Sequence, residues 1–157
     1  MTGTEFARRV TELTPMLYRI CFMQLHSPAD REDAVQEAIF RAWKKLHTLK
    51  NEEYFSTWLV RILINVCHDM QKRQRRLIPV ETVPEPVPEG AGRDEELKYA
   101  LTALDEKLRL PVLMHYIEGY SVREVADMLG LGLSAVKLRL MRGRKQLRDL
   151  LSEEVFK

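Results

Sequence analysis

The sequence predicts an all-α protein made of two small helical domains joined by a proline-rich linker. On both sides of the chain's middle, apolar residues recur at spacings of three and four, the period of amphipathic helices. Residues 77–93 interrupt this pattern with four prolines, two glycines and three glutamates. Proline favours extended backbone, so we expect a flexible linker there, between domains at residues 1–76 and 94–157. A long ordered loop within one domain is the alternative, and such loops are uncommon.

The composition is that of a folded protein whose basic residues are unevenly distributed. The 157 residues are 31% charged and 45% hydrophobic, and the formal net charge is only +2. Basic side chains nevertheless concentrate in two segments, residues 72–76 and 137–148. Two separated basic segments predict two regions of contact with a polyanion.

The remaining composition favours a cytoplasmic protein without a metal or a cofactor. Cys21 and Cys67 each lie among apolar residues and form no CxxC pair, so we interpret them as reduced core thiols. The four histidines do not recur at a metal-binding spacing, and no phosphate-binding glycine loop or catalytic-triad spacing is present. No apolar run reaches the roughly 20 residues of a membrane span, and the first residues lack an apolar signal-peptide core. We therefore expect the protein to stay in the cytoplasm. Because the sequence shows no phosphate-binding loop, catalytic triad or metal site, we also expect no enzymatic activity and no small-molecule substrate.

Three amphipathic helices are expected in the first domain. The first includes Pro15, so it is either kinked there or begins at Thr14. Ser27 can cap the second, with Pro28 in its first turn, and the third covers residues 55–73. The apolar positions of the first helix are Phe6, Val10, Leu13, Leu17 and Ile20. Those of the second are Val35, Ala38, Ile39, Ala42, Trp43 and Leu46, and those of the third are Trp58, Leu59, Ile62, Leu63, Val66 and Met70. We interpret both tryptophans as core residues rather than ligand contacts.

The second domain is expected to open with a helix over residues 95–108. Its apolar stripe consists of Leu97, Leu101, Leu104 and Leu108. Pro111 then restarts a short helix over residues 112–118, which ends at Gly119.

Residues 121–151 have the pattern of a helix-turn-helix. Ser121 and Glu124 can form a capping box, and Gly130 can end the helix that they begin. After a turn at residues 131–133, Ser134 can cap a second helix. The apolar positions are Val122, Val125, Ala126 and Leu129 on the first helix, and Val136, Leu140, Leu147 and Leu151, with Gly143, on the second. Two helices joined so tightly must cross steeply.

The second helix of this motif carries a basic face opposite its apolar seam. Near its N-terminal half lie Lys137, Leu138, Met141 and Arg142, where residues reach base edges when such a helix enters the major groove. Further basic positions on its flanks are Arg139, Arg144, Lys145 and Arg148. A solvated charged face is the alternative. Six basic residues without an acid between them, on this motif, favour contact with DNA.

Several segments together resemble the extracytoplasmic-function sigma factors, the smallest members of the bacterial sigma-70 family. Residues 30–43, DREDAVQEAIFRAW, are similar to the family's polymerase-binding helix. Residues 56–65, STWLVRILIN, with Asp69 and the basic residues 72–76, are similar to its promoter-melting helix. Residues 109–119, RLPVLMHYIEG, and the helix-turn-helix resemble its reader of the upstream promoter element. The resemblance spans residues 17–151 except the linker, and this order of segments is highly specific.

The resemblance implies a factor that binds core RNA polymerase, through its largest subunits, and recognises promoter DNA. The polymerase-binding positions would be Asp33, Gln36, Glu37 and Arg41, complementary to a coiled coil of clamp helices. Stabilisation of the helix start is the alternative for this acidic cluster, and it explains Asp30 and Asp33 but not Gln36 or Glu37.

The same resemblance implies two DNA-contacting sets. Candidates for the minus-ten element as it opens are Asn51, Tyr54, Arg61, Asn65, Lys72 and Arg73, because flipped bases need stacking partners and unpaired phosphates need cations. Candidates for the minus-thirty-five element are Ser121, Arg123, Ser134, Lys137, Leu138, Arg139, Met141, Arg142, Arg144 and Lys145. Leu138, Gly132 and Leu133 depart from the commonest family pattern, which leaves the promoter sequence open.

Factors of this group are usually held inactive by an anti-sigma protein, often membrane-anchored, and the resemblance implies such a partner here. It would cover either residues 33–37 or the basic face of the second domain. Two other functions stay open. A stand-alone helix-turn-helix regulator would bind a palindromic operator without polymerase. A decoy would mimic a sigma factor in protein binding without using DNA.

Overall fold

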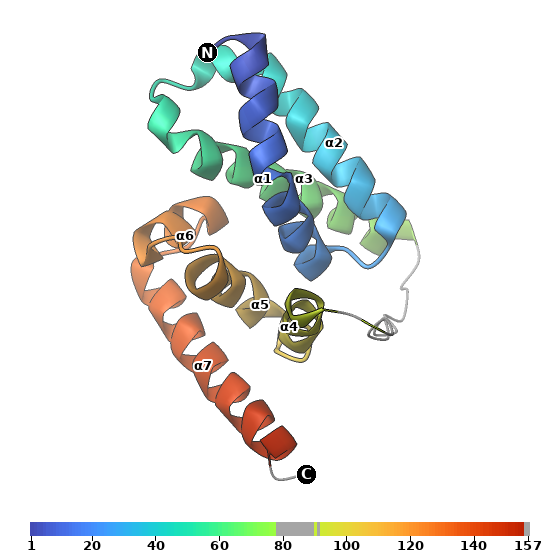
Figure 1. Ribbon diagram of the computed structural model, residues 1–157, viewed down its shortest axis with the longest axis vertical. Coiled ribbons are helices and arrows are strands. Elements are labelled where there is room, and N and C mark those ends of the chain that lie inside the picture. Colours follow the sequence, from blue (N-terminus) through green and yellow to red (C-terminus); the bar gives the residue numbers. More distant parts are fainter. Residues whose placement is uncertain (78–89, 91, 156–157) are drawn as a thin grey trace. The chain divides into compact units, whose positions relative to one another are not determined.

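The computed structural model describes the backbone of residues 1–77, 90 and 92–155 (Figure 1). The chain divides into two compact units, residues 1–82 and 83–157. All regular structure in the described ranges is helical, which confirms the predicted all-α class. The division falls within the predicted linker at residues 77–93, most of which lies outside the described residues, so its boundaries and flexibility stay predictions.

The first unit is a bundle of three helices that all contact one another: α1 (Gly3–Gln24), α2 (Pro28–Lys44) and α3 (Phe55–Leu77). Two short 3-10 turns, η1 (Leu46–Thr48) and η2 (Glu52–Tyr54), connect α2 to α3. The core consists of the apolar faces of the three helices, among them Leu17, Ile20, Ala34, Val35, Ala38, Leu59, Leu63 and Ile64. The predicted helices are thus confirmed, with α3 extending four residues beyond the predicted end.

Helix α1 runs without interruption through Pro15, so the alternative of a helix beginning at Thr14 is wrong. It begins at Gly3, with Thr2 as its N-cap, and Thr2 and Glu5 form a capping box. The Glu5 amide donates to Thr2 Oγ1 at 3.1 Å, and the Thr2 amide donates to Glu5 Oε2 at 3.1 Å. A Thr followed three residues later by Glu is a sequence signal for a helix start, and it identifies this end without the structure.

The two cysteines meet in the core of this bundle. Cys21 Sγ on α1 lies 3.9 Å from Cys67 Sγ on α3, and both side chains are fully buried. The interpretation of both as free core thiols is confirmed. The hydrogen bond with Cys67, together with burial, raises the pKa of the Cys21 thiol well above its ordinary value.

This raised pKa predicts a loss of stability in alkali. Because the folded state keeps the Cys21 proton while the unfolded state releases it, the stabilisation is complete below the unfolded thiol pKa and declines as pH rises above it. The free energy of unfolding should fall by about 1 kcal/mol between pH 9 and pH 10 from this group. Urea unfolding followed by tryptophan fluorescence measures it, because both tryptophans lie in the first unit. Cys21→Ala should show a shallower pH dependence, and an equal slope would contradict the prediction.

The two tryptophans differ in how far they are buried. Trp43 is half exposed and lies with its ring centroid 5.1 Å from that of Phe6, against the backbone of Gly3. Its assignment to the core is therefore wrong in part: one edge packs, and the other faces outward. Trp58 is half-buried beside Phe55, with ring centroids 6.0 Å apart, as a packing role requires.

The second unit consists of α4 (Arg93–Leu101), α5 (Glu106–Val112), a π-helical segment η3 (Leu113–Ile117), α6 (Val122–Leu129) and α7 (Leu133–Val155). The single helix predicted over residues 95–108 is wrong, because a turn at residues 102–105 divides it. Arg109 holds this turn, donating from Nε to the Leu104 carbonyl at 3.0 Å and from Nη2 to the Thr102 carbonyl at 2.8 Å. Leu101 before the break and Leu104 within it are both buried, so the leucine spacing alone does not reveal the break.

Pro111 lies inside α5 and does not begin a new helix. The chain continues from α5 directly into η3, where the Glu118 amide bonds to the Leu113 carbonyl at 3.0 Å, five residues back. The prediction of a helix restarting at Val112 is therefore wrong, although Gly119, with φ +82°, does follow the end of this segment.

Helix α7 packs against α5 at a point where only glycine fits. A Cβ built on Gly143 would lie 2.4 Å from Cγ2 of Val112, which is fully buried. Since Val112 is β-branched, its side chain cannot rotate out of the way. Gly143 therefore lies on the buried seam of α7, as predicted.

The close approach predicts opposite effects of one substitution in two backgrounds. Gly143→Ala should destabilise the second unit by about 1–3 kcal/mol, because overpacking exceeds the gain in helix propensity. In a Val112→Ala background the same substitution should stabilise by up to about 1 kcal/mol, since space is available and alanine favours the helix. Thermal unfolding of the four proteins gives the double-mutant cycle. The same sign in both backgrounds would contradict it.

Candidate functional site

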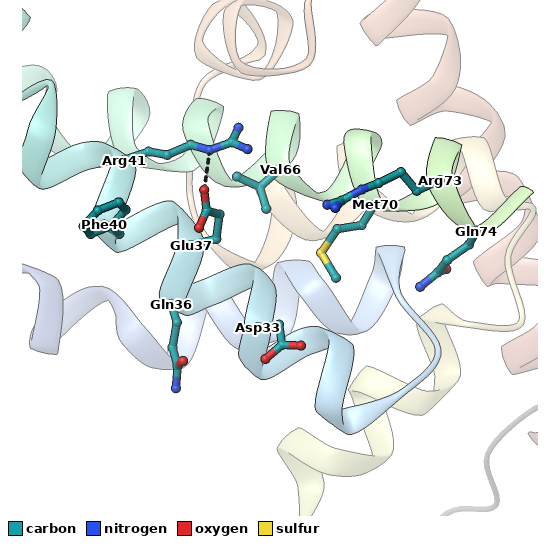
Figure 2. Close-up of a pocket in the computed structure, with 9 residues that line it drawn as sticks. All are labelled: Asp33, Gln36, Glu37, Phe40, Arg41, Val66, Met70, Arg73 and Gln74. Atoms are coloured by element: carbon teal, nitrogen blue, oxygen red, sulfur yellow. Dashed lines mark hydrogen bonds and ion pairs between the residues drawn. The ribbon is translucent and has the colours of Figure 1, made fainter. Parts of the chain in front are cut away.

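A groove of about 780 Å³ runs between α2 and α3 in the first unit (Figure 2). Its lining is Asp33, Gln36, Glu37, Phe40, Arg41, Val66, Met70, Arg73 and Gln74. Val66 is buried and Met70 half-buried, and together they give the groove an apolar part. Carboxylates and an amide line it from α2, whereas Arg73 lines it from α3. The groove is therefore apolar inside with charges of both signs along its edges.

The groove depends on how α2 is oriented in the bundle. Ser27 caps the helix, accepting the Asp30 amide at 3.3 Å, and Pro28 occupies its first position, as predicted. The small residues Ala34, Ala38 and Ala42 then face the core. The remaining side of the helix presents Asp33, Gln36, Glu37 and Phe40 at helical spacing, all of them exposed. The predicted polymerase-binding residues are thus brought together on one surface.

Arg41 is engaged within the protein. Its Nε donates to Glu37 Oε1 at 2.9 Å, and its Nη1 lies 3.6 Å from Asp69 Oδ2 on α3 (Figure 2 shows the Glu37 contact). This bridge joins the two walls of the groove and fixes the Glu37 carboxylate. Arg41 therefore organises the surface in addition to lining it.

Phe40 is the residue of this surface that sequence reasoning did not single out. Its side chain is 56% exposed, although it is large and apolar, and it lines the groove beside Glu37. Lys44 Nζ lies 4.9 Å from its ring centroid. The signal was present in the sequence, because Phe40 follows Gln36 by four residues on the polar side of α2.

The residues predicted to contact the minus-ten element divide into two groups. Arg61, Asn65 and Lys72 are exposed at spacings of four and seven on one side of α3. Arg73 lies one position further, about 100° around the helix, and lines the α2–α3 groove instead. The structure therefore separates Arg73 from the face with which it was grouped.

Asn51 and Tyr54 belong to the segment that leads into α3. The Glu53 amide donates to Asn51 Oδ1 at 3.0 Å, so the Asn51 side chain caps the short turn η2. The Tyr54 side chain is 60% exposed. Thr57 Oγ1 donates to the Tyr54 carbonyl at 3.0 Å and ties this turn to the first turn of α3.

The helix-turn-helix is formed as predicted by α6 and α7. Ser121 Oγ accepts the Glu124 amide at 3.1 Å, and Glu124 Oε1 accepts the Ser121 amide at 3.0 Å, which completes the capping box. Gly130 ends α6 with φ +66°, a left-handed conformation that favours glycine. The Ser121 hydroxyl is thus already used as a cap. Helix α7 begins at Leu133, so Ser134 lies in its first turn and is not the cap, which corrects the prediction.

The buried and exposed sides of the motif follow the predicted division closely. Val125, Ala126, Val136, Leu140 and Gly143 are buried. Met128 is buried as well, whereas the predicted core positions Val122, Leu129 and Leu147 are half-buried and the Leu151 side chain lies outside the described residues. Of the candidate DNA contacts, Arg139 is half-buried, and those exposed are Ser121, Arg123, Ser134, Lys137, Leu138, Met141, Arg142, Arg144 and Lys145.

The exposed face of α7 combines cations with apolar side chains. Lys137 and Arg142 lie there beside Leu138 and Met141, which are 42% and 53% exposed. Exposed apolar side chains next to cations can contact thymine methyl groups while the cations reach bases or phosphates. This face has the chemistry of a duplex-DNA reader.

Two further properties concern the part of the chain that the structure describes. No helix there combines the length and apolar character that a membrane crossing requires. Within the same residues, no three His, Cys, Asp or Glu side chains gather in a way that could hold a metal ion.

Comparison with known proteins agrees with this arrangement. The family model "Sigma-70 region 2" matches residues 9–77, and "Sigma-70, region 4" matches residues 94–147. The ECF RNA polymerase sigma factor SigX of Bacillus subtilis is 30% identical over 161 residues, which cover 89% of this chain and 81% of SigX. SigE of Mycolicibacterium smegmatis, also an ECF sigma factor, is 33% identical over 150 residues. The match covers 87% of this chain and 58% of that protein.

Two solved structures are similar along nearly the whole chain. The sigma factor RpoE of Bartonella quintana, in complex with the anti-sigma factor NepR, matches with a TM-score of 0.79 at 24% identity, covering 94% of this chain and 97% of RpoE. CnrH, in complex with the cytosolic domain of CnrY, matches with a TM-score of 0.71 at 26% identity, covering 97% and 90%. The fold is thus that of a two-domain sigma factor. The chain belongs to the extracytoplasmic-function (ECF) sigma factors of the sigma-70 family.

Proposed function

We propose that this chain binds core RNA polymerase and directs it to specific promoters. One observation carries the proposal: the chain contains a region 2 and a region 4 in the order that the family has them. The region 2 has a groove between α2 and α3, and the region 4 has an exposed basic recognition helix. The chain needs no chemistry of its own for this role. Its binding energy selects and opens the promoter, and polymerase performs the synthesis. It would act in the cytoplasm without a cofactor.

The groove between α2 and α3 is the proposed polymerase surface. A coiled coil of clamp helices on the largest subunit offers charged and amide side chains along its ridge. Asp33, Gln36 and Glu37 are exposed and complementary to such groups, and the Arg41 bridge holds Glu37 ready. Phe40 adds an apolar anchor at one end of the groove (Figure 2), so the surface combines aromatic and polar side chains as protein interfaces do.

The first unit is also the proposed reader of the minus-ten element. Strand opening exposes bases, which need stacking partners, and phosphates, which need cations. Asn51 and Tyr54 would meet the bases, and Arg61, Asn65 and Lys72 would follow the backbone along α3. Arg73 lies on the groove edge, where it would contact polymerase or a phosphate at the margin of both surfaces.

The second unit is the proposed reader of the minus-thirty-five element as duplex. The N-terminal half of α7 would enter the major groove, with Lys137 and Arg142 toward bases and Leu138 toward a thymine methyl. Met141 would pack against base edges beside Leu138. The flanking candidates would contact phosphates; these are Ser121, Arg123, Ser134, Arg139, Arg144 and Lys145.

An anti-sigma protein is the proposed regulator. The solved structure of RpoE is a complex with the anti-sigma factor NepR, and that of CnrH is a complex with the cytosolic domain of CnrY. Here such a partner would cover the groove face of α2 or the basic face of α7, blocking polymerase or DNA. Membrane anchoring of the partner is a further part of this proposal.

Run-off transcription tests the function. Core polymerase is mixed with the protein and with sheared genomic DNA, and the start sites of the transcripts are sequenced. We expect a set of start sites absent with core enzyme alone, preceded by shared sequence near −10 and −35. Start sites unaltered by the protein would overturn the proposal.

The same samples distinguish the two alternatives. A stand-alone regulator would bind DNA tightly without core enzyme, with strong salt dependence, on a palindromic site. A decoy would bind core enzyme yet yield no promoter-dependent transcripts. A sigma factor requires both core binding and start-site selection.

A further inference from the structure

Arg9 on α1 reaches out of its helix to the segment that carries two of the minus-ten candidates. Its Nη2 donates to the backbone carbonyl of Glu52 at 2.8 Å, across 43 residues of sequence. Its guanidinium carbon also lies 4.8 Å from the ring centroid of Phe55. One side chain therefore contacts both the turn η2 and the first residue of α3.

The segment needs such a contact because burial does little to hold it. Residues 50–54 are all exposed, whereas Phe55, which follows them, is fully buried. The Asn51 cap on the Glu53 amide is local and fixes the turn internally. The Met1 ammonium lies 3.1 Å from Glu52 Oε1 and holds the side chain of this turn. The bond from Arg9 instead ties the backbone of the turn to α1, and the backbone carries Asn51 and Tyr54 with it.

Arginine is suited to make both contacts at once. The N–H groups of a guanidinium point outward in its plane, while its faces can lie on an aromatic ring. In-plane donation to the Glu52 carbonyl is thus compatible with packing on Phe55. Phe55 is in turn held edge-to-face by Phe6, at 5.8 Å between centroids, so the platform under Arg9 is rigid.

We propose that Arg9 is a positioning residue for minus-ten recognition: by holding the Glu52 backbone it sets the positions of Asn51 and Tyr54, and hence base selectivity at that element. This inference rests on the proposed function. Arg9 itself would touch no DNA. Recognition of an extruded base requires its contacts to be held within a fraction of an ångström, so a turn released from α1 loses selectivity before the protein loses its fold.

The test uses full-length holoenzymes and a linear template library in which the −10 and −35 regions are randomised separately. Transcribed templates are sequenced, and the enrichment of the favoured base is measured at each position. Arg9→Ala should lower the −10 enrichment by about threefold or more and leave the −35 enrichment unchanged. Arg9→Lys should fall between Arg9→Ala and the wild type, because an ammonium can donate to the carbonyl but cannot lie flat on the ring.

Arg8→Ala is the matched control. Arg8 is the preceding residue of the same helix, and its Nη1 pairs instead with Glu12 at 2.9 Å on an exposed side of α1. The substitution Arg8→Ala removes the same charge from the same helix as Arg9→Ala does, and it should leave the enrichment at both −10 and −35 unchanged. Core binding and thermal unfolding of each variant show whether the bundle is intact.

The outcomes separate this inference from the proposed function. Unchanged −10 enrichment in Arg9→Ala, or an equal fall at −10 and −35, overturns the positioning role while the wild type still selects promoters. Equal loss in Arg8→Ala assigns the effect to helix charge and overturns it as well. If the wild type enriches no sequence at all, the proposed function fails, and the inference fails with it.

Discussion

Arg142→Glu in the recognition helix should reduce transcription from promoters that depend on the minus-thirty-five element by about 10- to 100-fold. Arg142 is exposed on α7 near Lys137, on the face opposite the buried Val136 and Leu140. An arginine that reads a base is worth about 1–3 kcal/mol, and a glutamate there also repels the phosphates on either side. Run-off transcription with the variant holoenzyme on a selected promoter measures the effect.

Lys107→Glu is the matched control for this prediction. Lys107 is exposed on α5 in the same unit and belongs to none of the candidate sets, and the substitution makes the same change of charge. It should leave transcription unchanged. If Arg142→Glu were equally harmless while core binding persisted, the decoy alternative would replace the proposed reading of DNA.

The two proposed surfaces differ in a way that suits their partners. The groove face of α2 carries carboxylates and an amide around Phe40, whereas α7 carries cations around Leu138 and Met141. The first chemistry is repelled by nucleic acid and fits a protein, and the second fits a polyanion. A near-neutral net charge of +2 conceals this separation, and only the positions of the charges disclose it.

The sequence predicts the elements of this fold well because each depends on a local pattern. The capping box at Ser121 and the left-handed end at Gly130 are each encoded by a few neighbouring residues. The capping box at Thr2 has the same local pattern, although it was not predicted. The steric need for Gly143 was only partly visible. Its position on the seam follows from helical spacing, but the reason for glycine is the approach of Val112 from α5, which no local pattern contains.

The predictions that proved wrong concern places where contacts between residues far apart in the sequence decide the structure, because the local sequence pattern there fits more than one structure. The leucine spacing across residues 101–108 fits a continuous helix, and the break at residues 102–105 depends on Arg109 and on Gln146 of α7, whose Nε2 donates to Asp105 Oδ2 at 2.9 Å. Lys72 and Arg73 look equivalent in sequence, yet 100° of helical rotation places only Arg73 on the groove. Trp43 fits an apolar stripe, but it lies at an edge of the bundle.

Phe40→Ala should weaken the binding of core polymerase by about 30-fold with little effect on the stability of the chain. An exposed aromatic side chain surrounded by polar groups has the features of an interface hot spot, whose truncation costs about 2 kcal/mol or more. Phe40 has this setting, because Glu37, Gln36 and Arg41 line the groove around it. With more than half of its side chain already in solvent, its removal leaves no cavity in the core.

Tyr18→Ala separates this effect from a general loss of aromatic surface. Tyr18 is the comparable exposed aromatic residue on α1, 39% exposed and outside the groove lining, so its loss should leave the affinity for core enzyme unchanged. Affinity is measured by titrating labelled protein with core polymerase, and thermal unfolding of both variants reports stability. If Phe40→Ala bound core enzyme as tightly as the wild type, the groove between α2 and α3 would not be the polymerase surface. The alternative of helix-start stabilisation would then remain for Asp30 and Asp33, but it explains neither Gln36 and Glu37 nor the exposed Phe40.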